Sequence, residues 1–227
     1  AKYLLFKMKP PRRGDYFTML GHLGMTGRMF LQSARRTAPS HAAVVFDLGS
    51  HHFVFEDTRY FGRMTLDDSP LAILGPEPLG EGFDGDVLRE RFGPSRQAIK
   101  VKLLDQSVVA GIGNIYACEA LFRARISPRK AAGRLTKSER HTLADAIRAT
   151  LAEAIAGGST VPLDFAGTAQ RDGLFYYGRA ENASDYYEEQ LAVYGREADP
   201  CLKCATSIRR IVQNARGTWY CPTCQRG

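Results

Sequence analysis

Four cysteines near the C-terminal end constrain the fold of this chain more than any other feature. Cys201 and Cys204 form one Cys-x-x-Cys pair, and Cys221 and Cys224 form a second pair after sixteen intervening residues. Each pair can present two thiolates to one ion from a tight turn, and two pairs complete a tetrahedral site without an open position. The spacing therefore predicts a single structural zinc ion.

The segment between the two pairs is expected to form a short hairpin over residues 208–220 that turns near residues 214–217. Arg216 would then lie at a tip that the zinc holds rigid, where it could contact an anion. Two disulfides are the alternative use of the four thiols, but paired Cys-x-x-Cys motifs and the odd fifth cysteine favour metal in a reducing compartment. That fifth residue, Cys118, lies in an apolar helical run and is expected to be a buried, inert thiol.

The formal net charge of +7 is concentrated at the two ends of the chain. Such a distribution predicts a polyanion held from two sides, although a merely soluble basic protein remains open. The sequence shows neither a stretch long enough to span a membrane nor a secretory signal, so we expect a cytoplasmic protein without a membrane partner. The basic residues of the two ends are Lys2, Lys7, Lys9, Arg12, Arg13, Arg28, Arg35 and Arg36, and Arg196, Lys203, Arg209, Arg210, Arg216 and Arg226.

The distribution of turn residues predicts an α+β chain. Residues 1–68 are expected to form a β-domain, residues 69–82 a linker rich in proline, glycine and acids, residues 83–190 a helical domain, and residues 191–227 the zinc finger. The expected strands cover residues 2–8, 16–23, 28–32, 43–48 and 53–56, with a further strand at 191–194 that leads into the finger.

Helices are expected over residues 84–92, 95–105 and 114–124, followed by one long helix that ends near residue 157. A capping box, Thr136-x-x-Glu139, predicts where the long helix begins. One row of this helix, spaced by four residues, is expected to face the core. It consists of Leu143, Ile147, Leu151 and Ile155.

Three short motifs could contact nucleic acid. Asn114 follows Gly111-x-Gly113 at the start of a helix, where amides and a side-chain donor could bind a phosphate; a plain helix cap is the alternative. Met25 lies at the tip of the turn 22–27 and could act as an apolar wedge or as core filler. Arg59-x-Phe61 repeats the pairing of a charge with a wedge, since an arginine can replace the hydrogen bonds of a lost partner base.

Taken in order along the chain, these motifs resemble the formamidopyrimidine-DNA glycosylase family of bacterial base-excision repair enzymes. The resemblance covers nearly the whole chain, and this many motifs in register are highly specific. The matching segments are residues 2–6 (Lys-Tyr-Leu-Leu-Phe), 22–27 (His-Leu-Gly-Met-Thr-Gly), 57–62, 75–79, 109–117, 193–196 and the cysteine finger.

The resemblance implies a two-domain enzyme in which a β-sandwich precedes a helix–two-turns–helix domain and a zinc finger. Its substrate would be damaged double-stranded DNA, from which the enzyme would flip out and remove oxidised purines such as formamidopyrimidine and 8-oxoguanine. Removal of the base through a Schiff base would be followed by strand cleavage through β,δ-elimination. The resemblance also implies a monomer.

The resemblance assigns roles to single residues. Met25, Arg59 and Phe61 would fill the vacated space, while Asn114 and Arg216 would clamp phosphates. Lys2 and Arg216 would donate protons in β- and δ-elimination, because a cation beside a departing phosphate stabilises developing negative charge. The other expected DNA contacts are His22, His41 and Arg96, the last of which lies beside Ser95, where the family often has a lysine.

The chain departs from the family pattern in two further places. The nucleophilic N-terminal proline of the family and the glutamate beside it would precede residue 1, so we expect this chain to be a fragment that is inactive alone. The loop at residues 174–190 is atypical, which leaves the preferred base open. An endonuclease VIII-like enzyme for oxidised pyrimidines is therefore one alternative. A non-catalytic protein that binds damaged DNA is another, if the polypeptide truly starts at residue 1.

Overall fold

The computed structural model describes residues 2–9, 14–24, 27–156 and 191–226. These residues form two compact units, a β-rich unit over residues 2–72 and a helical unit over residues 73–156 and 191–226. Met25 and the atypical loop at 174–190 lie outside the described residues.

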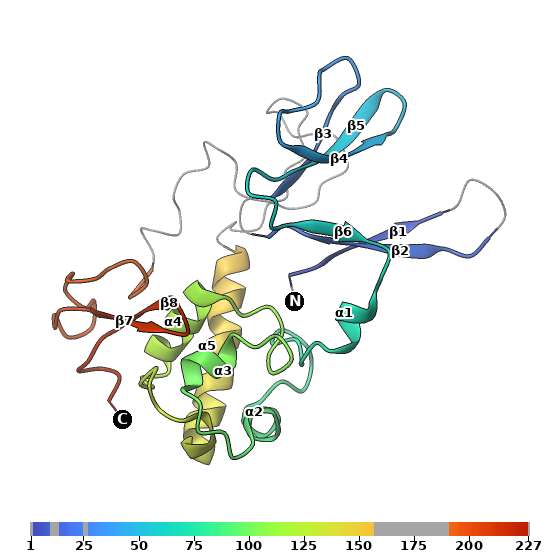
Figure 1. The fold of residues 1–227 in the computed structure, drawn as a ribbon. Helices are drawn as coiled ribbons and strands as arrows, with labels where there is room; N and C mark the ends of the chain where they lie inside the picture. Colours follow the sequence, from blue (N-terminus) through green and yellow to red (C-terminus); the bar gives the residue numbers. More distant parts are fainter. Residues whose placement is uncertain (1, 10–13, 25–26, 157–190, 227) are drawn as a thin grey trace. The chain divides into compact units, whose positions relative to one another are not determined.

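The β-rich unit contains two antiparallel three-stranded sheets (Figure 1). One sheet has the order β1-β2-β6 and the other the order β3-β5-β4. All five strands predicted for residues 1–68 are present. The sixth, β6, escaped prediction because it has only three residues and owes its extended form to pairing with β2. The bounds are Leu4–Met8 for β1, Phe17–His22 for β2, Arg28–Ser33 for β3, Ala42–Asp47 for β4, His51–Glu56 for β5 and Arg63–Thr65 for β6.

The helical unit is formed by α2, α3, α4 and α5 around one apolar core that includes Leu88, Leu121 and Leu143. The predicted capping box begins α5, since the amide of Glu139 donates to Thr136 Oγ1 and the amide of Thr136 donates to the carboxylate of Glu139. The bounds are Ser69–Ala72 for α1, Gly85–Phe92 for α2, Ile99–Leu103 for α3, Asn114–Arg123 for α4, Ala132–Arg134 for the 3-10 helix η1 and Lys137–Ala156 for α5.

Three local expectations for the helical unit are wrong. The helix predicted over 95–105 is confined to α3, because Ala98 is extended (ψ 135°) and forms a bridge with Ala131. Residues 191–194 form no strand; three of their amides instead donate to the carboxylate of Glu119. Ile155 is 51% exposed and lies outside the core that Leu143 and Ile147 share.

The finger hairpin consists of β7 (Arg209–Gln213) and β8 (Arg216–Tyr220) and packs beside α4 (Figure 1). Gln213 pairs with Arg216, so the connection has only two residues, Asn214 and Ala215, both with positive φ. Such a turn matches the twist of the two strands. Arg216 therefore begins β8 directly after the tip.

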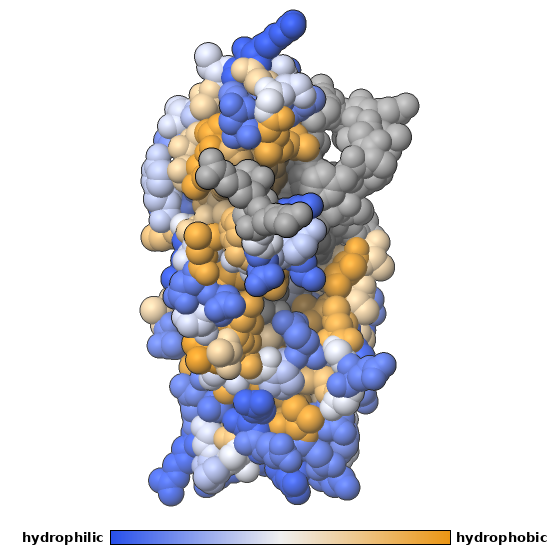
Figure 2. Space-filling model, turned by 90° about the vertical axis from the view of Figure 1, so that its right-hand side faces the viewer, coloured by the Kyte–Doolittle hydropathy of each residue, from blue (hydrophilic) through white to orange (hydrophobic). Residues whose placement is uncertain are grey.

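On the face that Figure 2 shows, hydrophobic residues lie between hydrophilic ones. No helix among the described residues is both long and apolar enough to cross a membrane. The exposed apolar side chains include Leu5, Phe61, Leu202 and Val212.

Candidate nucleic-acid interface and zinc centre

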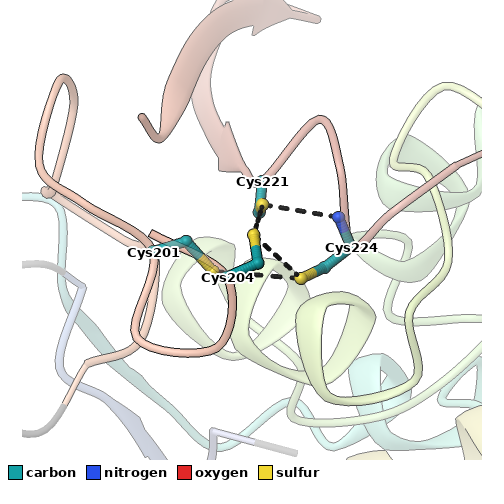
Figure 3. A group of neighbouring side chains, drawn as sticks. All are labelled: Cys201, Cys204, Cys221 and Cys224. Carbon is teal, nitrogen blue, oxygen red and sulfur yellow. Dashed lines mark hydrogen bonds between the residues drawn. The ribbon is translucent and has the colours of Figure 1, made fainter. Parts of the chain in front are cut away.

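The four cysteines of the finger converge on one point. Their sulfur atoms all lie within 4.8 Å of one another and face a common centre (Figure 3). The Sγ atoms of Cys204 and Cys221 are 3.5 Å apart and those of Cys201 and Cys224 are 3.9 Å apart, close to the edge of about 3.8 Å expected for a ZnS4 tetrahedron. All four are free thiols, which excludes the disulfide alternative in this structure.

Backbone amides donate hydrogen bonds to two of these sulfurs. The amide of Lys203 donates to Cys201 Sγ, and that of Cys224 donates to Cys221 Sγ, each at 3.4 Å. Hydrogen bonds from Thr206 lower the pKa of Cys204 to about 6, whereas burial and the neighbouring sulfurs raise the pKa of Cys224 to about 12. A divalent cation at the centre would stabilise all four thiolates together. The donor set fits one structural zinc ion.

The predicted phosphate clamps, Asn114 and Arg216, are brought together at the finger tip. Asn114 begins α4, and its Nδ2 donates to the carbonyl oxygen of Gly217 at 3.0 Å. Gly217 follows Arg216, whose side chain is exposed and has no hydrogen-bond partner within the described residues. An amide nitrogen carries two protons, so Asn114 keeps one donor for a ligand.

A residue that sequence reasoning missed, Lys100, completes this group. It is fully buried, and its Nζ donates to the same Gly217 oxygen at 3.4 Å. Burial and the charge of Arg216 lower the pKa of Lys100, and no carboxylate pairs with it among the described residues. The only signal in the sequence is a lysine within the apolar run of α3. The result is a positive site that lacks its own counter-ion.

Two glutamines fasten the finger to the helices below this site. Gln213 Nε2 donates to the carbonyl of Pro128 at 3.2 Å. The buried side chain of Gln225 bridges the two parts, because it accepts from the amide of Cys221 and donates to the carbonyl of Ile126. The finger is thus fixed to the segment 126–128, which follows α4, both next to the hairpin tip and beyond the end of β8.

A second basic group lies in the β-rich unit. His22 at the end of β2 pairs in register with Arg63 of β6, and burial, followed by the charges of Arg63 and Lys2, lowers the pKa of His22. The Nδ1 atom of His22 accepts a hydrogen bond from the amide of Gly24 at 3.1 Å. The neutral ring therefore carries its proton on Nε2. Lys2 and His22 were predicted as separate site residues, whereas Arg63 was missed.

The Arg59–Phe61 motif lies in the loop between β5 and β6. The Arg59 guanidinium carbon is 5.6 Å from the centre of the Phe61 ring, and Phe61 is 62% exposed. The ring of His41, also exposed, meets that of Tyr60 edge-on at 6.4 Å. Arg96, by contrast, is exposed in the loop before α3 and has no contact with the other predicted site residues in the described part of the chain.

These two groups of cations and the exposed apolar ring, combined with the zinc finger, define a zinc-containing protein built to bind nucleic acid. Comparison with known families identifies which nucleic-acid-binding family this is. Residues 1–64 match the formamidopyrimidine-DNA glycosylase N-terminal domain, residues 74–164 match the H2TH domain of the same enzymes, and residues 198–227 match the zinc finger found in FPG and IleRS.

Individual proteins agree with these matches. The formamidopyrimidine-DNA glycosylase of Desulfitobacterium hafniense is 42% identical over 232 residues, which cover 99% of this chain and 79% of the relative. That of Cereibacter sphaeroides is 42% identical over 227 residues, 92% of this chain and 76% of the relative. The chain belongs to the formamidopyrimidine-DNA glycosylase family, the DNA glycosylases that act on damaged DNA.

Solved structures support the fold prediction. The MutM (Fpg) protein of Thermus thermophilus is 37% identical, with a TM-score of 0.78 over 99% of this chain and 79% of that one. Lactococcus lactis Fpg, in complex with DNA that contains an abasic site, is 32% identical, with a TM-score of 0.79. The match covers 100% of this chain and 79% of that one. The predicted α+β architecture and its structural zinc are confirmed.

Proposed function

We propose that this protein is a bifunctional glycosylase and abasic-site lyase that removes oxidised purines from duplex DNA. The observation that carries the proposal is the convergence of Asn114 and Lys100 on the carbonyl of Gly217, the residue after Arg216 at the start of β8. Positive charge without a carboxylate partner, beside the free amide proton of Asn114, suits a DNA phosphate. Relatives support the substrate class, since one solved MutM complex contains carbocyclic 8-oxoguanine and one L. lactis Fpg complex contains Fapy-dG.

Contacts to the base would come from the β-rich unit. Arg59 and Phe61 are exposed and lie next to each other, so the ring can enter a base stack while the guanidinium satisfies the orphaned partner base. His22 would donate to a phosphate through Nε2, because Nδ1 is occupied by the Gly24 amide. We include His41 and Arg96 as further backbone contacts, and Met25 as the second wedge.

The chemistry would proceed through an amine nucleophile that the family resemblance places before residue 1. Its attack on C1′ expels the base and forms an imine with the deoxyribose. Loss of the 3′ phosphate and then the 5′ phosphate follows by β- and δ-elimination. Lys2 and Arg216 would act beside these departing phosphates, where a cation stabilises the developing charge.

Borohydride trapping of the intact gene product tests this proposal. We expect a covalent adduct with duplex DNA that contains 8-oxoguanine opposite cytosine, and none with undamaged duplex. Tight binding without an adduct would instead support the non-catalytic alternative. A parallel duplex with thymine glycol separates the purine enzyme from an endonuclease VIII-like enzyme, because the latter would cleave the pyrimidine lesion faster.

A further inference from the structure

The loop between β5 and β6 is built around a buried aspartate to which the proposed function assigns no role. Asp57 is 1% exposed. One of its carboxylate oxygens accepts the amide of Gly62 at 2.7 Å, and the other accepts the amide of Arg59 at 3.3 Å. Both ends of the segment that carries Phe61 are thus tied to a single side chain.

The backbone of Asp57 ties the same loop to the residue before β4. Its amide donates to the carbonyl of His41 at 3.1 Å, and its own carbonyl accepts the amide of Tyr60 at 3.4 Å. Tyr60 has a φ of 55°, a conformation that costs a side chain of this size about 1 kcal/mol or more. Such strain persists where surrounding contacts over-determine the backbone, and the Asp57 carboxylate provides such contacts.

The loop also interlocks with the turn that begins at His22. A Cβ atom on Gly24 would lie 2.6 Å from the amide nitrogen of Gly62 and 2.7 Å from the carbonyl carbon of Phe61. A Cβ atom on Gly62 would lie 2.8 Å from the carbonyl oxygen of His22. Only glycine permits this approach, so the position of one backbone fixes that of the other.

We propose that Asp57 is a positioning residue for the repair reaction. Its carboxylate holds Arg59 and Phe61 at the geometry in which they fill the vacated space in the duplex. The inference rests on the proposed function, because Asp57 itself does not contact DNA. Asp57 acts only through Arg59 and Phe61, which the proposed function places in the duplex. An isosteric amide can accept one of the two amide protons but presents a donor to the other, so Asp57→Asn loosens the loop at one end.

A double-mutant cycle in the intact gene product tests the role of Asp57. Asp57→Asn, Phe61→Ala and the double variant are compared by the single-turnover rate on 8-oxoguanine duplex, corrected for the folded fraction seen by circular dichroism. Asp57→Asn is expected to lower the rate by on the order of tenfold, because small displacements from reactive geometry are costly. In the Phe61→Ala background, Asp57→Asn is expected to lower the rate by about twofold or less, because the residue through which Asp57 acts is already missing.

Asp47 provides the matched control. Its carboxylate accepts the amide of Gly49 at 2.8 Å in an exposed turn of the same unit, so Asp47→Asn makes the same chemical change away from the loop. We expect this variant to retain the parent rate.

Each other outcome overturns a stated part of the inference. If the effects of Asp57→Asn and Phe61→Ala multiply in full, Asp57 does not act through the loop and the inference is wrong. If Phe61→Ala and Arg59→Ala leave the rate unchanged, the proposed function loses its wedge and the inference falls with it. If Asp57→Asn does not fold, the cycle is repeated with Asp57→Ser. Failure of both to fold while Asp47→Asn folds would assign Asp57 to the fold alone.

Discussion

Asn114 and His22 show how one hydrogen bond prepares a side chain for a partner on its other side. Asn114 gives one amide proton to the Gly217 carbonyl, which leaves the second proton for a ligand. His22 accepts from the Gly24 amide at Nδ1, which leaves Nε2 as a donor. In both residues a bond to the backbone fixes the orientation of the side chain and which of its atoms can donate to a ligand. Such preorganisation reduces the entropy that binding must overcome.

We expect His22 to titrate below its ordinary pKa of 6.5, because burial and the charges of Arg63 and Lys2 disfavour the imidazolium. The neutral form is the one that accepts from Gly24, so the stability it contributes is present above pH 6.5 and lost as the pH falls through the lowered pKa. NMR titration of the ring measures this value. Arg63→Gln should move it upward, and an unchanged pKa in that variant would argue against the proximity of the two side chains.

Arg216→Ala should weaken DNA binding by a similar factor for all sequences, because a phosphate contact carries no base information. The slope of log affinity against log salt should become shallower by about 0.9 for the lost contact. Fluorescence anisotropy at several salt concentrations measures both effects. Arg91→Ala, an exposed arginine of α2, is the matched control and should change neither.

At the scale of secondary-structure elements, a local signal sets the start of α5, whereas tertiary contacts set the start of α3. The capping box predicted the start of α5, and Thr136 and Glu139 form both of its bonds. The apolar pattern at 95–105 also reads as a helix, yet only α3 forms. Its first residue, Ile99, donates its amide to the distant carbonyl of Lys130, and Ala98 before it pairs with Ala131. A long-range bridge therefore overrides local propensity in this segment.

Loss of the α5 cap should measurably lower the stability of the protein. Thr136→Ala removes the acceptor for the Glu139 amide and should lower the free energy of unfolding by about 1 kcal/mol. Thr142→Ala on the exposed face of the same helix is the control and should be neutral or slightly stabilising, since alanine is the better helix former. Urea denaturation of both variants measures these free energies. Equal losses of free energy in the two variants would show that the cap does not stabilise the N-terminal end of α5.

At the scale of the whole molecule, the zinc centre and the helical unit share one apolar cluster. Cys201 and Cys221 are buried with Cys118, Phe122 and Val193, so the metal site and α4 have a common core. The β-rich unit has its own buried residues, among them Met29 and Phe55. Loss of zinc is therefore expected to affect the helical unit first.

Chelation of zinc should remove hydrogen-exchange protection from α4 and the β7–β8 hairpin while the sheet β3-β5-β4 keeps its own. Cys204→Ser should reproduce the effect and also abolish tight DNA binding. Mass spectrometry of exchange by peptide measures the change. Protection lost equally in both units would show that their stabilities are coupled.

Much of the candidate site could be predicted because its motifs are local. A Cys-x-x-Cys turn, a glycine-bearing helix start and a strand-end histidine are each recognisable from a few neighbouring residues. Lys100, Arg63 and Asp57 could not be assigned in this way. Their roles depend on the Gly217 carbonyl, on the pKa of His22 and on the backbone turn at Gly62. Only in the last case is the partner close in sequence.

By itself, the sequence determined the family, the four zinc ligands and most of the elements, because spacing and periodicity encode local geometry. Only the tertiary structure decided that Asn114 and Lys100 meet at the finger tip, and that a buried carboxylate holds the Arg59–Phe61 loop. No periodic pattern in the sequence reveals these contacts, because the groups are far apart along the chain or because their burial cannot be read from neighbouring residues. Burial gives them their strength, since unpaired polar groups in an apolar interior are costly, and burial is a property of the folded molecule alone.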